Sequence, residues 1–374
     1  MPLYCRRSPV LVSYWQSGDL VFENYLAGTR TAAAPVTSAI LHFFERWRPV
    51  TDLAAVFPQF TAASLSRTLA QLASAQLLEI SRSPRPSAKN TAASWESWGP
   101  SAAFFHFSTK DTNTPVEPDD SLKNLRRRAR AVRPPPPFKA LSGVPKVLLP
   151  EPVVSGDFSR ALLARRTWRK FSAAPVALAD LSTLLWLTFG VQWWLEYPGV
   201  GRVPKKTSPS GGSRHPIEGY VYALRVAGLP RGVYHYNSAA HRLERIRRGA
   251  AAPEISRLLN RQWWFGKAAF VVFLTAVFAR TEWKYPAPRA YRAVLAEAGH
   301  VCQTFCLTAA SRGLAPFCTM AMRDSAVERA LKIDGVSESV LYATGCGLPP
   351  KGSGWSPWPG RPLGRRVPNS PARR

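Results

Sequence analysis

Apolar residues in the first part of the chain recur at the spacing of helices. Between positions 36 and 44 they fall three and four residues apart, which gives a helix one buried face. A short apolar stretch at 53–57 predicts a second helix. Leucines repeat the helical spacing over residues 62–76, and Thr61 can cap this third helix. The pattern therefore predicts three consecutive helices.

Short apolar runs before and after these helices predict strands. The run at 77–80 indicates one strand, and runs at 10–14 and 20–22 indicate a small hairpin. Three helices followed by a strand resemble a winged helix-turn-helix. Residues 62–76, however, carry Arg67 as their only cation, whereas a recognition helix offers several side chains to phosphates and base edges. The pattern argues against nucleic acid as a partner and leaves peptide-binding and structural roles open.

The second half of the chain alternates between helical and strand patterns. Residues 217–226 and 339–344 predict strands, and the long apolar run at 268–279 predicts the most buried strand. A helical pattern spans 289–312. Helices alternating with a few strands indicate a layered α+β or α/β domain.

Composition divides the chain into four parts. We predict a winged-helix-like module over residues 1–100 and a Pro/Arg-rich linker over 101–150, with four successive prolines at 134–137. A larger domain then covers residues 151–350. A basic tail rich in proline and glycine covers residues 351–374.

Charge and cysteine content constrain the partners and the compartment. The net charge of +27, from 50 Lys and Arg against 23 Asp and Glu, favours anionic partners, although much of the excess lies in the linker and tail. The five cysteines are odd in number and form no CxxC pair, which disfavours a disulfide framework or a zinc site. The first residues lack a signal-peptide pattern, and residues 268–279 are too few to span a bilayer. We expect a cytoplasmic protein without a membrane segment.

Two polar stretches suit a phosphorylated ligand. Residues 207–216 place three serines, a threonine and paired glycines directly before a predicted strand. An exposed turn and a ligand cradle are both compatible with this loop alone. Residues 165–170 contain four cations and Thr167, which suit a phosphate or the end of a helix dipole. The sequence has neither a GxGxxG motif opening a helix nor a GxxxxGK[ST] motif. The classical dinucleotide-binding and P-loop modes of phosphate binding are therefore disfavoured.

These stretches belong to an ordered set of motifs. Residues 165–171 (Arg-Arg-Thr-Trp-Arg-Lys-Phe) resemble the Arg-Arg-Ser-x-Arg-x-Phe opening of the FMN-dependent nitroreductase superfamily. Residues 209–216 are similar to the Pro-Ser-Ala-Gly-Ala loop of its SagB-type dehydrogenases, and residues 232–236 to their Gly-Leu-Tyr-His-Tyr. The Lys284-Tyr285 pair and residues 289–292 match their next two motifs. Glu297-Ala298-Gly299-His300 and Arg312-Gly313-Leu314 continue the order, so that the resemblance covers about 155–350.

The resemblance implies a fold and an activity. SagB-type enzymes oxidise thiazoline and oxazoline rings in ribosomally made peptides to thiazoles and oxazoles. We therefore expect an α+β fold with a central, mostly antiparallel sheet flanked by helices, bound FMN, and a homodimer with FMN at its interface. The expected partners are a modified peptide substrate and a cyclodehydratase complex. The N-terminal region resembles winged-helix modules fused to some of these enzymes.

The resemblance also implies roles for individual residues. Lys284 and Tyr285 are the expected catalytic pair, and either one can be the base that takes the ring proton. The C-terminal cation near the FMN phosphate is Lys351 or Arg361. The expected cofactor-binding residues are Arg165, Arg166, Thr167, Arg169, Pro209, Ser210, Gly211, Gly212, Ser213 and Arg361.

Two features depart from the family pattern. Thr167 replaces the usual serine but keeps the hydroxyl group. Pro286 follows the Lys-Tyr pair directly and restricts the backbone of Tyr285.

Other readings remain open at this point. One alternative is an NAD(P)H-dependent nitro or flavin reductase; another is a flavin-free peptide- or DNA-binding winged-helix protein with a degenerate dehydrogenase domain. The pairs Trp193-Trp194 and Trp263-Trp264 either line a peptide channel or pack in the core.

Histidines and cysteines give no clear site. His215, His235 and His300 have no carboxylate or cysteine at a diagnostic spacing. Cys302 and Cys306 share an apolar helix face, which favours packing over metal binding. We therefore expect no metal.

Overall fold

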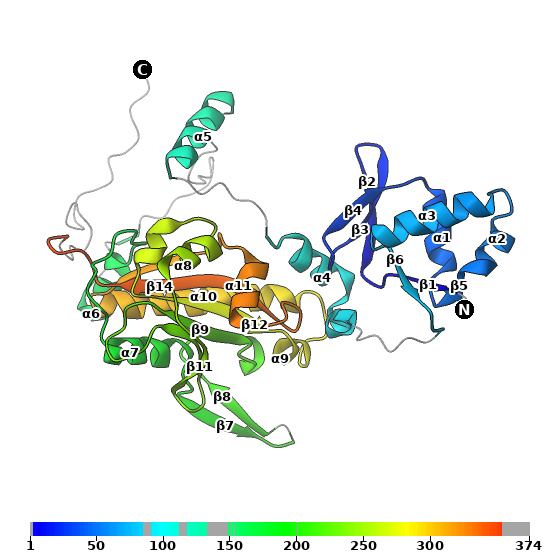
Figure 1. The fold of residues 1–374 in the computed structure, drawn as a ribbon. Helices are drawn as coiled ribbons and strands as arrows, with labels where there is room; N and C mark the ends of the chain where they lie inside the picture. Colours follow the sequence, from blue (N-terminus) through cyan, green and yellow to red (C-terminus); the bar gives the residue numbers. More distant parts are fainter. Residues whose placement is uncertain are drawn as a thin grey trace. The chain divides into compact units, whose positions relative to one another are not determined.

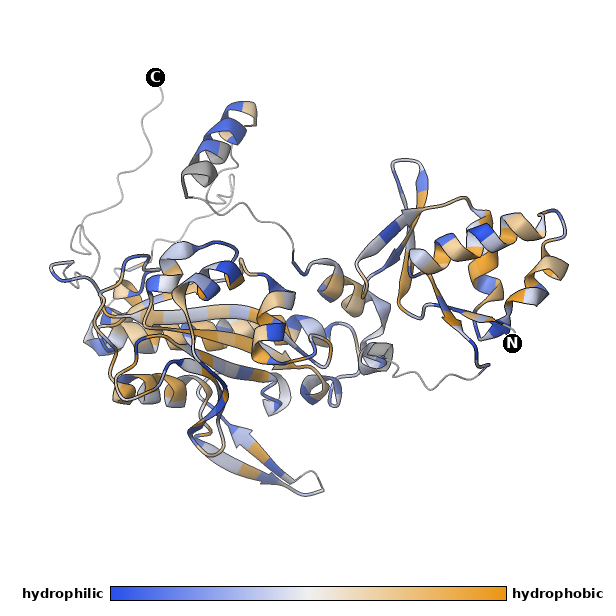
Figure 2. Ribbon diagram, in the orientation of Figure 1, coloured by the Kyte–Doolittle hydropathy of each residue, from blue (hydrophilic) through white to orange (hydrophobic). Residues whose placement is uncertain are grey.

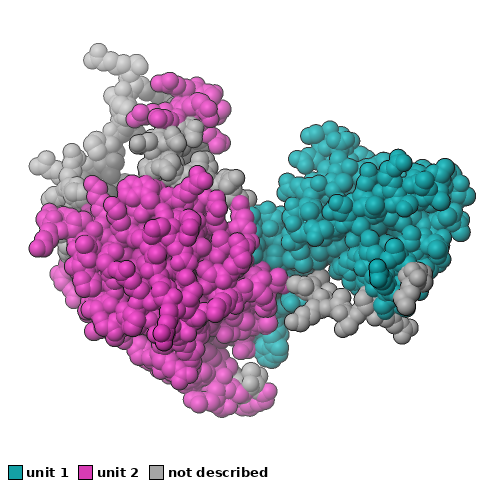
Figure 3. Space-filling model, viewed as in Figure 1, with its two compact units in different colours: residues 1–110, 282–292 teal, residues 111–281, 293–374 magenta. Residues whose placement is uncertain are grey.

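The computed structural model describes residues 3–84, 91–111, 118–132, 149–150, 152, 154–199 and 201–353 (Figure 1). The chain forms two compact units (Figure 3). The N-terminal unit comprises residues 1–110 and 282–292, and the larger unit comprises residues 111–281 and 293–374. The segment 282–292 thus lies within the range predicted for the second domain but packs with the N-terminal unit.

The N-terminal unit contains two three-stranded antiparallel sheets. The strand β1 (Tyr4–Arg7) lies between β5 (Arg48–Pro49) and β6 (Leu78–Ser81). The predicted hairpin is present as β2 (Leu11–Gln16) and β3 (Asp19–Asn24), and β4 (Thr29–Ala32) extends it. The turn at Ser17 and Gly18 has positive φ at both residues, which suits the twist of a tight hairpin.

The three predicted helices of this unit are present. They are α1 (Val36–Phe43), α2 (Leu53–Val56), which follows the short 3₁₀ turn η1 (Val50–Asp52), and α3 (Ala62–Ser74). Thr61 caps α3 as predicted, because its side chain accepts a hydrogen bond from the backbone of Ser64. The leucines of α3 pack with α1 and the start of β6 in one core, and apolar residues dominate α1 (Figure 2).

The N-terminal unit also includes an aromatic helical arm. The arm consists of η2 (Thr91–Trp98) and α4 (Gly99–Ser108). Trp95, Trp98 and His106 are buried in it, and this apolar content holds α4 to the unit although residues 101–108 were predicted as linker. A second helix, α5 (Pro118–Ala131), also lies within the predicted linker, whereas residues 134–137 are outside the described part.

The larger unit is built on a six-stranded antiparallel sheet, as an α+β fold predicts. The strand order is β11-β10-β9-β12-β14-β13. The strands are β9 (Ile217–Ala223), β10 (Gly232–Asn237), β11 (Arg242–Arg248), β12 (Phe270–Val277), β13 (Ala315–Thr319) and β14 (Glu338–Gly347). A separate hairpin is formed by β7 (Trp193–Tyr197) and β8 (Gly201–Lys205).

Helices cover both faces of this sheet. They are α6 (Gly156–Ala164), α7 (Leu178–Phe189), α8 (Ala252–Leu258), α9 (Ala279–Glu282), α10 (Ala290–Ser311) and α11 (Asp324–Leu331), with the 3₁₀ turns η3 (Gly211–Ser213) and η4 (Trp263–Lys267). Val271 and Phe273 of β12 pack in one core with α8 and α11, whereas Phe270 faces Phe305 of α10. Because both faces are covered, β12 is apolar except for Thr275, whose hydroxyl donates a hydrogen bond to Glu338. Within the described residues, no helix has both the length and the apolar composition that a bilayer crossing requires.

Candidate active site

The loop 207–216 is fixed by its own hydroxyl groups. The Ser208 hydroxyl lies 2.7 Å from the Thr304 hydroxyl of α10, and the Ser210 hydroxyl accepts a hydrogen bond of 2.8 Å from the backbone of His215. Ser208 is buried. Ser210, which the sequence resemblance assigns to the cofactor site, thus already has a partner inside the chain. These hydrogen bonds tie the loop to α10 and to its own end at His215.

Left-handed backbone conformations shape the same loop. Gly212, Ser213 and His215 have φ values of 61°, 55° and 45°. A side chain at the first of these positions would be strained, so the glycine at 212 has a conformational reason. The Lys205 ammonium group donates a hydrogen bond of 2.7 Å to the Ser213 hydroxyl and holds the turn from β8.

Buried polar groups lie beneath the loop. Glu297 of α10 is buried, and its carboxylate lies 3.8 Å from Nδ1 of His215. Burial raises the pKa of Glu297 to about 7, although a hydrogen bond with Ser210 and the charges of Lys206 and Arg280 oppose this change. Burial, together with the charge of Lys206, lowers the pKa of His215 to about 4. His215 is therefore neutral at pH 7, and its contact with Glu297 is not an ion pair there.

A second carboxylate ties the loop to the sheet. Glu218 of β9 accepts hydrogen bonds from Arg280 at 2.5 Å and from Nε2 of His235 at 2.9 Å, and Arg280 also donates to the His215 carbonyl at 3.0 Å. Burial alone would raise the pKa of Glu218, but His235 and Arg280 lower it. Nδ1 of His235 lies 3.2 Å from Glu244.

Two of the histidines thus have carboxylate partners, His215 with Glu297 and His235 with Glu218 and Glu244, that no diagnostic sequence spacing indicated. The partners are distant in sequence or lie across the β10–β11 hairpin, where His235 pairs with Glu244. The hairpin turn at 238–241 is the sequence signal that would have revealed this pair.

The cationic segment 165–170 lies beside β13, an edge strand of the six-stranded sheet. It follows α6, and the Trp168 amide donates a hydrogen bond of 2.9 Å to the Pro316 carbonyl of β13. The Arg166 guanidinium lies 4.0 Å from the centre of the Trp168 ring. No carboxylate in the described residues forms an ion pair with Arg165, Arg166 or Arg169. Their charge is therefore available to an anion, which fits the phosphate of FMN.

The loop runs along the sheet and does not lie at one end of it. The strand register sets Trp168, through Pro316, level with Ala223 at the end of β9. The last residue of the loop precedes Ile217 at the start of β9, about 20 Å away along the strand direction. The beginning of the loop, at Ser208, contacts α10 beside the Phe305 ring that faces β12. In Figure 1, α6 and α9 mark the two ends of the sheet.

Lys284 and Tyr285 lie in the segment that belongs to the N-terminal unit. Both side chains are exposed, and the Lys284 ammonium group lies 5.6 Å from the centre of the Tyr285 ring. The two side chains thus form a cation–π contact with each other and are open to solvent. The C-terminal cation stays a prediction, because Lys351 is exposed and Arg361 lies outside the described residues.

Three thiol groups cluster behind the sheet. Cys302 and Cys306 of α10 and Cys318 of β13 have sulfur atoms within 4.8 Å of one another. The helical spacing in the sequence pairs Cys302 with Cys306 but gives no sign of Cys318, because that contact depends on how β13 packs. Hydrogen bonding with its two neighbours and burial raise the pKa of Cys302, so this thiol stays neutral.

The tryptophan pairs differ in exposure. Trp264 is buried, whereas Trp263 and both residues of the Trp193-Trp194 pair are exposed. Packing thus accounts for Trp264 alone.

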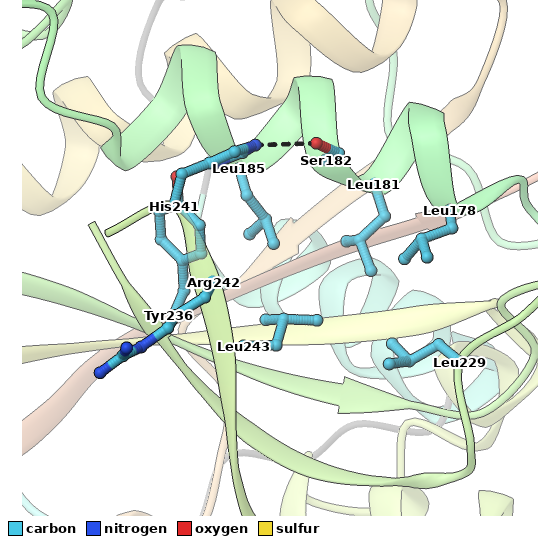
Figure 4. Close-up of a pocket in the computed structure, with 9 residues that line it drawn as sticks. All are labelled: Leu178, Leu181, Ser182, Leu185, Leu229, Tyr236, His241, Arg242 and Leu243. Atoms are coloured by element: carbon cyan, nitrogen blue, oxygen red, sulfur yellow. Dashed lines mark hydrogen bonds between the residues drawn. The ribbon is translucent and has the colours of Figure 1, made fainter. Parts of the chain in front are cut away.

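An apolar cavity lies away from all of the predicted site residues. It has a volume of about 360 Å³ between α7 and the β10–β11 hairpin, and leucines form much of its lining (Figure 4). The Ser182 hydroxyl lies 2.9 Å from Nε2 of His241, whose Nδ1 lies 2.7 Å from the Tyr236 hydroxyl. Burial raises the pKa of Tyr236 to about 12, so this phenol is neutral and cannot stabilise an imidazolium as a carboxylate would. The cavity therefore lacks the groups of a serine hydrolase.

Sequence comparisons agree with the position of these motifs. The nitroreductase family model matches residues 162–348. A nitroreductase-family protein of Methanocaldococcus jannaschii is 33% identical over 172 residues, which are 46% of this chain and 82% of that protein. The trifolitoxin-processing protein TfxB of Rhizobium leguminosarum bv. trifolii is 38% identical over 151 residues, which are 38% of this chain and 40% of TfxB.

Solved structures include two similar chains. A chain of the E. coli microcin synthetase complex McbBCD, with truncated pro-MccB17 bound, has a TM-score of 0.45 and 20% identity over 70% of this chain and 98% of that chain. A nitroreductase of Ralstonia eutropha has a TM-score of 0.43 and 24% identity over 57% of this chain and 98% of that chain.

Proposed function

Because the chain belongs to the nitroreductase family, we propose that it is an FMN-dependent dehydrogenase acting on a ribosomally made peptide. Its reaction is the oxidation of thiazoline or oxazoline rings to thiazoles or oxazoles. The observation that carries the proposal is the exposed Lys284–Tyr285 pair, which lies inside the matched range. The 38% identity with TfxB, a protein named for trifolitoxin processing, supports a peptide substrate.

In this proposal the cations of residues 165–169 and the loop 207–216 hold FMN. Arg165 and Arg169 bind the phosphate with Thr167, and the turn at Gly211 and Gly212 lies against the remainder of the cofactor. Bound FMN supplies the hydride acceptor. The fixed conformation of the loop supports this role, since a rigid site loses little entropy when it binds.

The Lys284–Tyr285 pair takes the proton in the proposed reaction. Aromatisation of the ring removes a hydride from one ring carbon and a proton from its neighbour, so the site needs a base. A neutral lysine amine or a tyrosine phenolate can each accept that proton. Either residue fits the role.

We further propose a homodimer in which each cofactor site uses both copies. The family resemblance implies FMN at a homodimer interface, and about 20 Å along the sheet separates Trp168 of the cationic segment from the end of the loop at Pro216. A second copy that supplies its loop to the segment of the first would complete the site. The exposed apolar residues Phe158, Leu162 and Leu163 of α6, next to the segment, support a partner surface there.

The remaining partners follow from the chemistry of the substrate. An azoline ring forms when a Cys, Ser or Thr side chain cyclises onto the preceding amide with loss of water. A cyclodehydratase must therefore supply the substrate. Residues 1–100, as a winged-helix-like module, are proposed to contribute to recognition of the peptide rather than to flavin binding.

The function is tested with the Lys284→Ala variant. Purified wild-type protein should carry flavin and remove two hydrogens from each azoline ring of a peptide, which mass spectrometry detects. Lys284→Ala should keep its flavin, because the proposed phosphate contacts are untouched, and should lose about 100-fold or more in ring oxidation. Undiminished oxidation by the variant would refute the role of Lys284.

The same assay separates the rival functions. Steady NAD(P)H oxidation with a nitroarene, equal in wild type and Lys284→Ala, together with no ring oxidation, would identify a nitro or flavin reductase. The family match alone is compatible with that activity. A colourless protein that takes up no added FMN would identify a flavin-free binding protein.

A further inference from the structure

The helical arm of the N-terminal unit contacts the segment that carries the proposed catalytic pair. The indole N–H of Trp98 donates a hydrogen bond of 3.0 Å to the backbone carbonyl of Tyr285. The hydroxyl of Ser97 donates one of 2.7 Å to the carboxylate of Glu282. Two adjacent residues of η2 therefore contact the chain on both sides of Lys284, Trp98 at a backbone carbonyl and Ser97 at a side chain. Trp98 is fully buried, which shields its hydrogen bond from competition by water.

The far end of the segment is fixed in an aromatic cluster. The Tyr291 ring lies 5.5 Å from Trp95, 5.8 Å from Trp98 and 6.3 Å from Phe105, measured between ring centres. Its hydroxyl lies 2.7 Å from Nδ1 of His106. Burial lowers the pKa of His106 to about 3, so His106 is neutral and this hydrogen bond does not change between pH 5 and pH 9.

The side chains between these anchors point to solvent. Trp283 is 66% exposed and Tyr285 is 38% exposed, and Lys284 is exposed as well. Pro286 and Pro288 follow and restrict the backbone further. The segment thus has a fixed main chain and accessible side chains. That combination is what a proton-transferring pair needs, because it must meet a substrate in a defined geometry.

We propose that Trp98 is a positioning residue for the Lys284–Tyr285 pair. This inference rests on the proposed function, since it assigns the pair a role in ring oxidation. Trp98 touches neither cofactor nor substrate in this assignment. It acts through the carbonyl of Tyr285, and it makes the N-terminal unit part of the machinery for proton transfer.

The test compares Trp98→Phe with Trp95→Phe. Both variants replace a buried indole of η2 with a smaller ring, but only the first removes the donor to the Tyr285 carbonyl. With an azoline peptide, Trp98→Phe should lower kcat about tenfold or more, because misplacement of a reacting group by ~1 Å can cost about 100-fold. KM and flavin content should stay within about twofold of wild type. Trp95→Phe should keep kcat within about threefold.

A double-mutant cycle shows whether Trp98 acts through the pair. In a Tyr285→Phe or Lys284→Arg background with measurable residual activity, Trp98→Phe should have little further effect on kcat. A merely structural role would give independent, multiplicative losses, and that outcome would overturn the inference. Equal kcat losses in Trp98→Phe and Trp95→Phe would overturn it too.

The outcomes separate this inference from the proposed function. If Lys284→Ala abolishes ring oxidation and Trp98→Phe leaves kcat unchanged, only the positioning role fails. If Lys284→Ala stays active, the proposed function fails first. Should Trp98→Phe not fold, Ser97→Ala removes the exposed hydrogen bond to Glu282 without changing the core. It should lower kcat about threefold with flavin content unchanged, and no change would count against the inference.

Discussion

The loop 207–216 and the segment 282–292 both carry proposed chemistry, but the chain anchors them by different means. Hydroxyl groups and buried charges hold the loop, and they come from α10 and β9 of the larger unit. Aromatic rings hold the segment, and they come from η2 and α4, as with Trp98, which is 187 positions from Tyr285. The loop therefore depends on protonation states, and the segment depends on the packing of the N-terminal unit.

Because the anchors differ, the two proposed tasks can be disturbed separately. A change of pH alters the charges beneath the loop, whereas His106 and the rings around Tyr291 stay neutral. A cavity in the aromatic cluster should release the segment and leave the loop in place. Three measurements, in decreasing order of free-energy change, test this separation.

The largest effect is expected from Tyr291→Ala. Removing a buried aromatic ring costs about 3–5 kcal/mol through lost burial and the cavity that remains. Hydrogen exchange should show this loss at amides of α4 and residues 282–292 and little change at residues 207–216. Trp15→Ala is the matched control, because Trp15 of the same unit is 68% exposed and its removal should cost less than about 0.5 kcal/mol. Equal destabilisation of the loop would break the comparison.

The next effect is a pH dependence that Glu297 contributes to the larger unit. Burial raises the pKa of Glu297 from its ordinary 4.5 to about 7, so the folded protein keeps a proton that the unfolded chain releases above pH 4.5. Its contribution to the free energy of unfolding is thus fully present below pH 4.5 and is lost as pH rises to about 7. His215, Lys206, Arg280 and the hydroxyl of Ser210 are the groups that face it.

Glu297→Gln isolates this contribution, because glutamine keeps the shape and cannot ionise. Urea unfolding of the flavin-free protein should show the variant gaining about 2–3 kcal/mol on wild type between pH 4.5 and pH 8. His215 is common to both proteins, so its own titration cancels in the difference. A difference that does not vary with pH would mean that Glu297 does not titrate there.

The smallest effect concerns the backbone of the loop. Gly212→Ala should cost about 1 kcal/mol, because alanine at a φ of 61° is strained. Gly211→Ala is the matched neighbour without a positive φ and should cost less. Both are measured as free energies of unfolding without flavin. If Gly211→Ala cost more than Gly212→Ala, the need for glycine in this turn would come from lack of space for a side chain and not from backbone conformation.

Local patterns predicted the elements that depend on local physics. The predicted helix over 62–76 is α3, because a helix buried on one face has apolar residues three and four positions apart. The predicted strand over 268–279 is β12, because a strand buried on both faces gives a continuous apolar run. The strands β1 and β13 were missed, since each is short and gains its stability from partners far away in the sequence.

The candidate site was predicted residue by residue but not in its arrangement. Motif order identified the loop, the cationic segment and the Lys284–Tyr285 pair as separate stretches. Nothing in their spacing reveals where the strand register sets the first two along the sheet, or that Trp98 contacts the third. Glu297 was recognised only as part of a motif, and its raised pKa was not predicted because it comes from burial beneath a loop 80 to 90 positions away.

The path of α10 limits how this protein can be recombined. The helix begins with Ala290 in the N-terminal unit and continues from Ala293 in the larger one. Residues 1–110 therefore cannot be replaced by those of a relative as an independent domain. A chimera that takes residues 1–110 from a relative would surround Tyr291 with foreign side chains. Residues 282–292 must be transplanted with them. Residues 1–110 and 282–292 are therefore expected to covary in evolution, although they are far apart in the sequence.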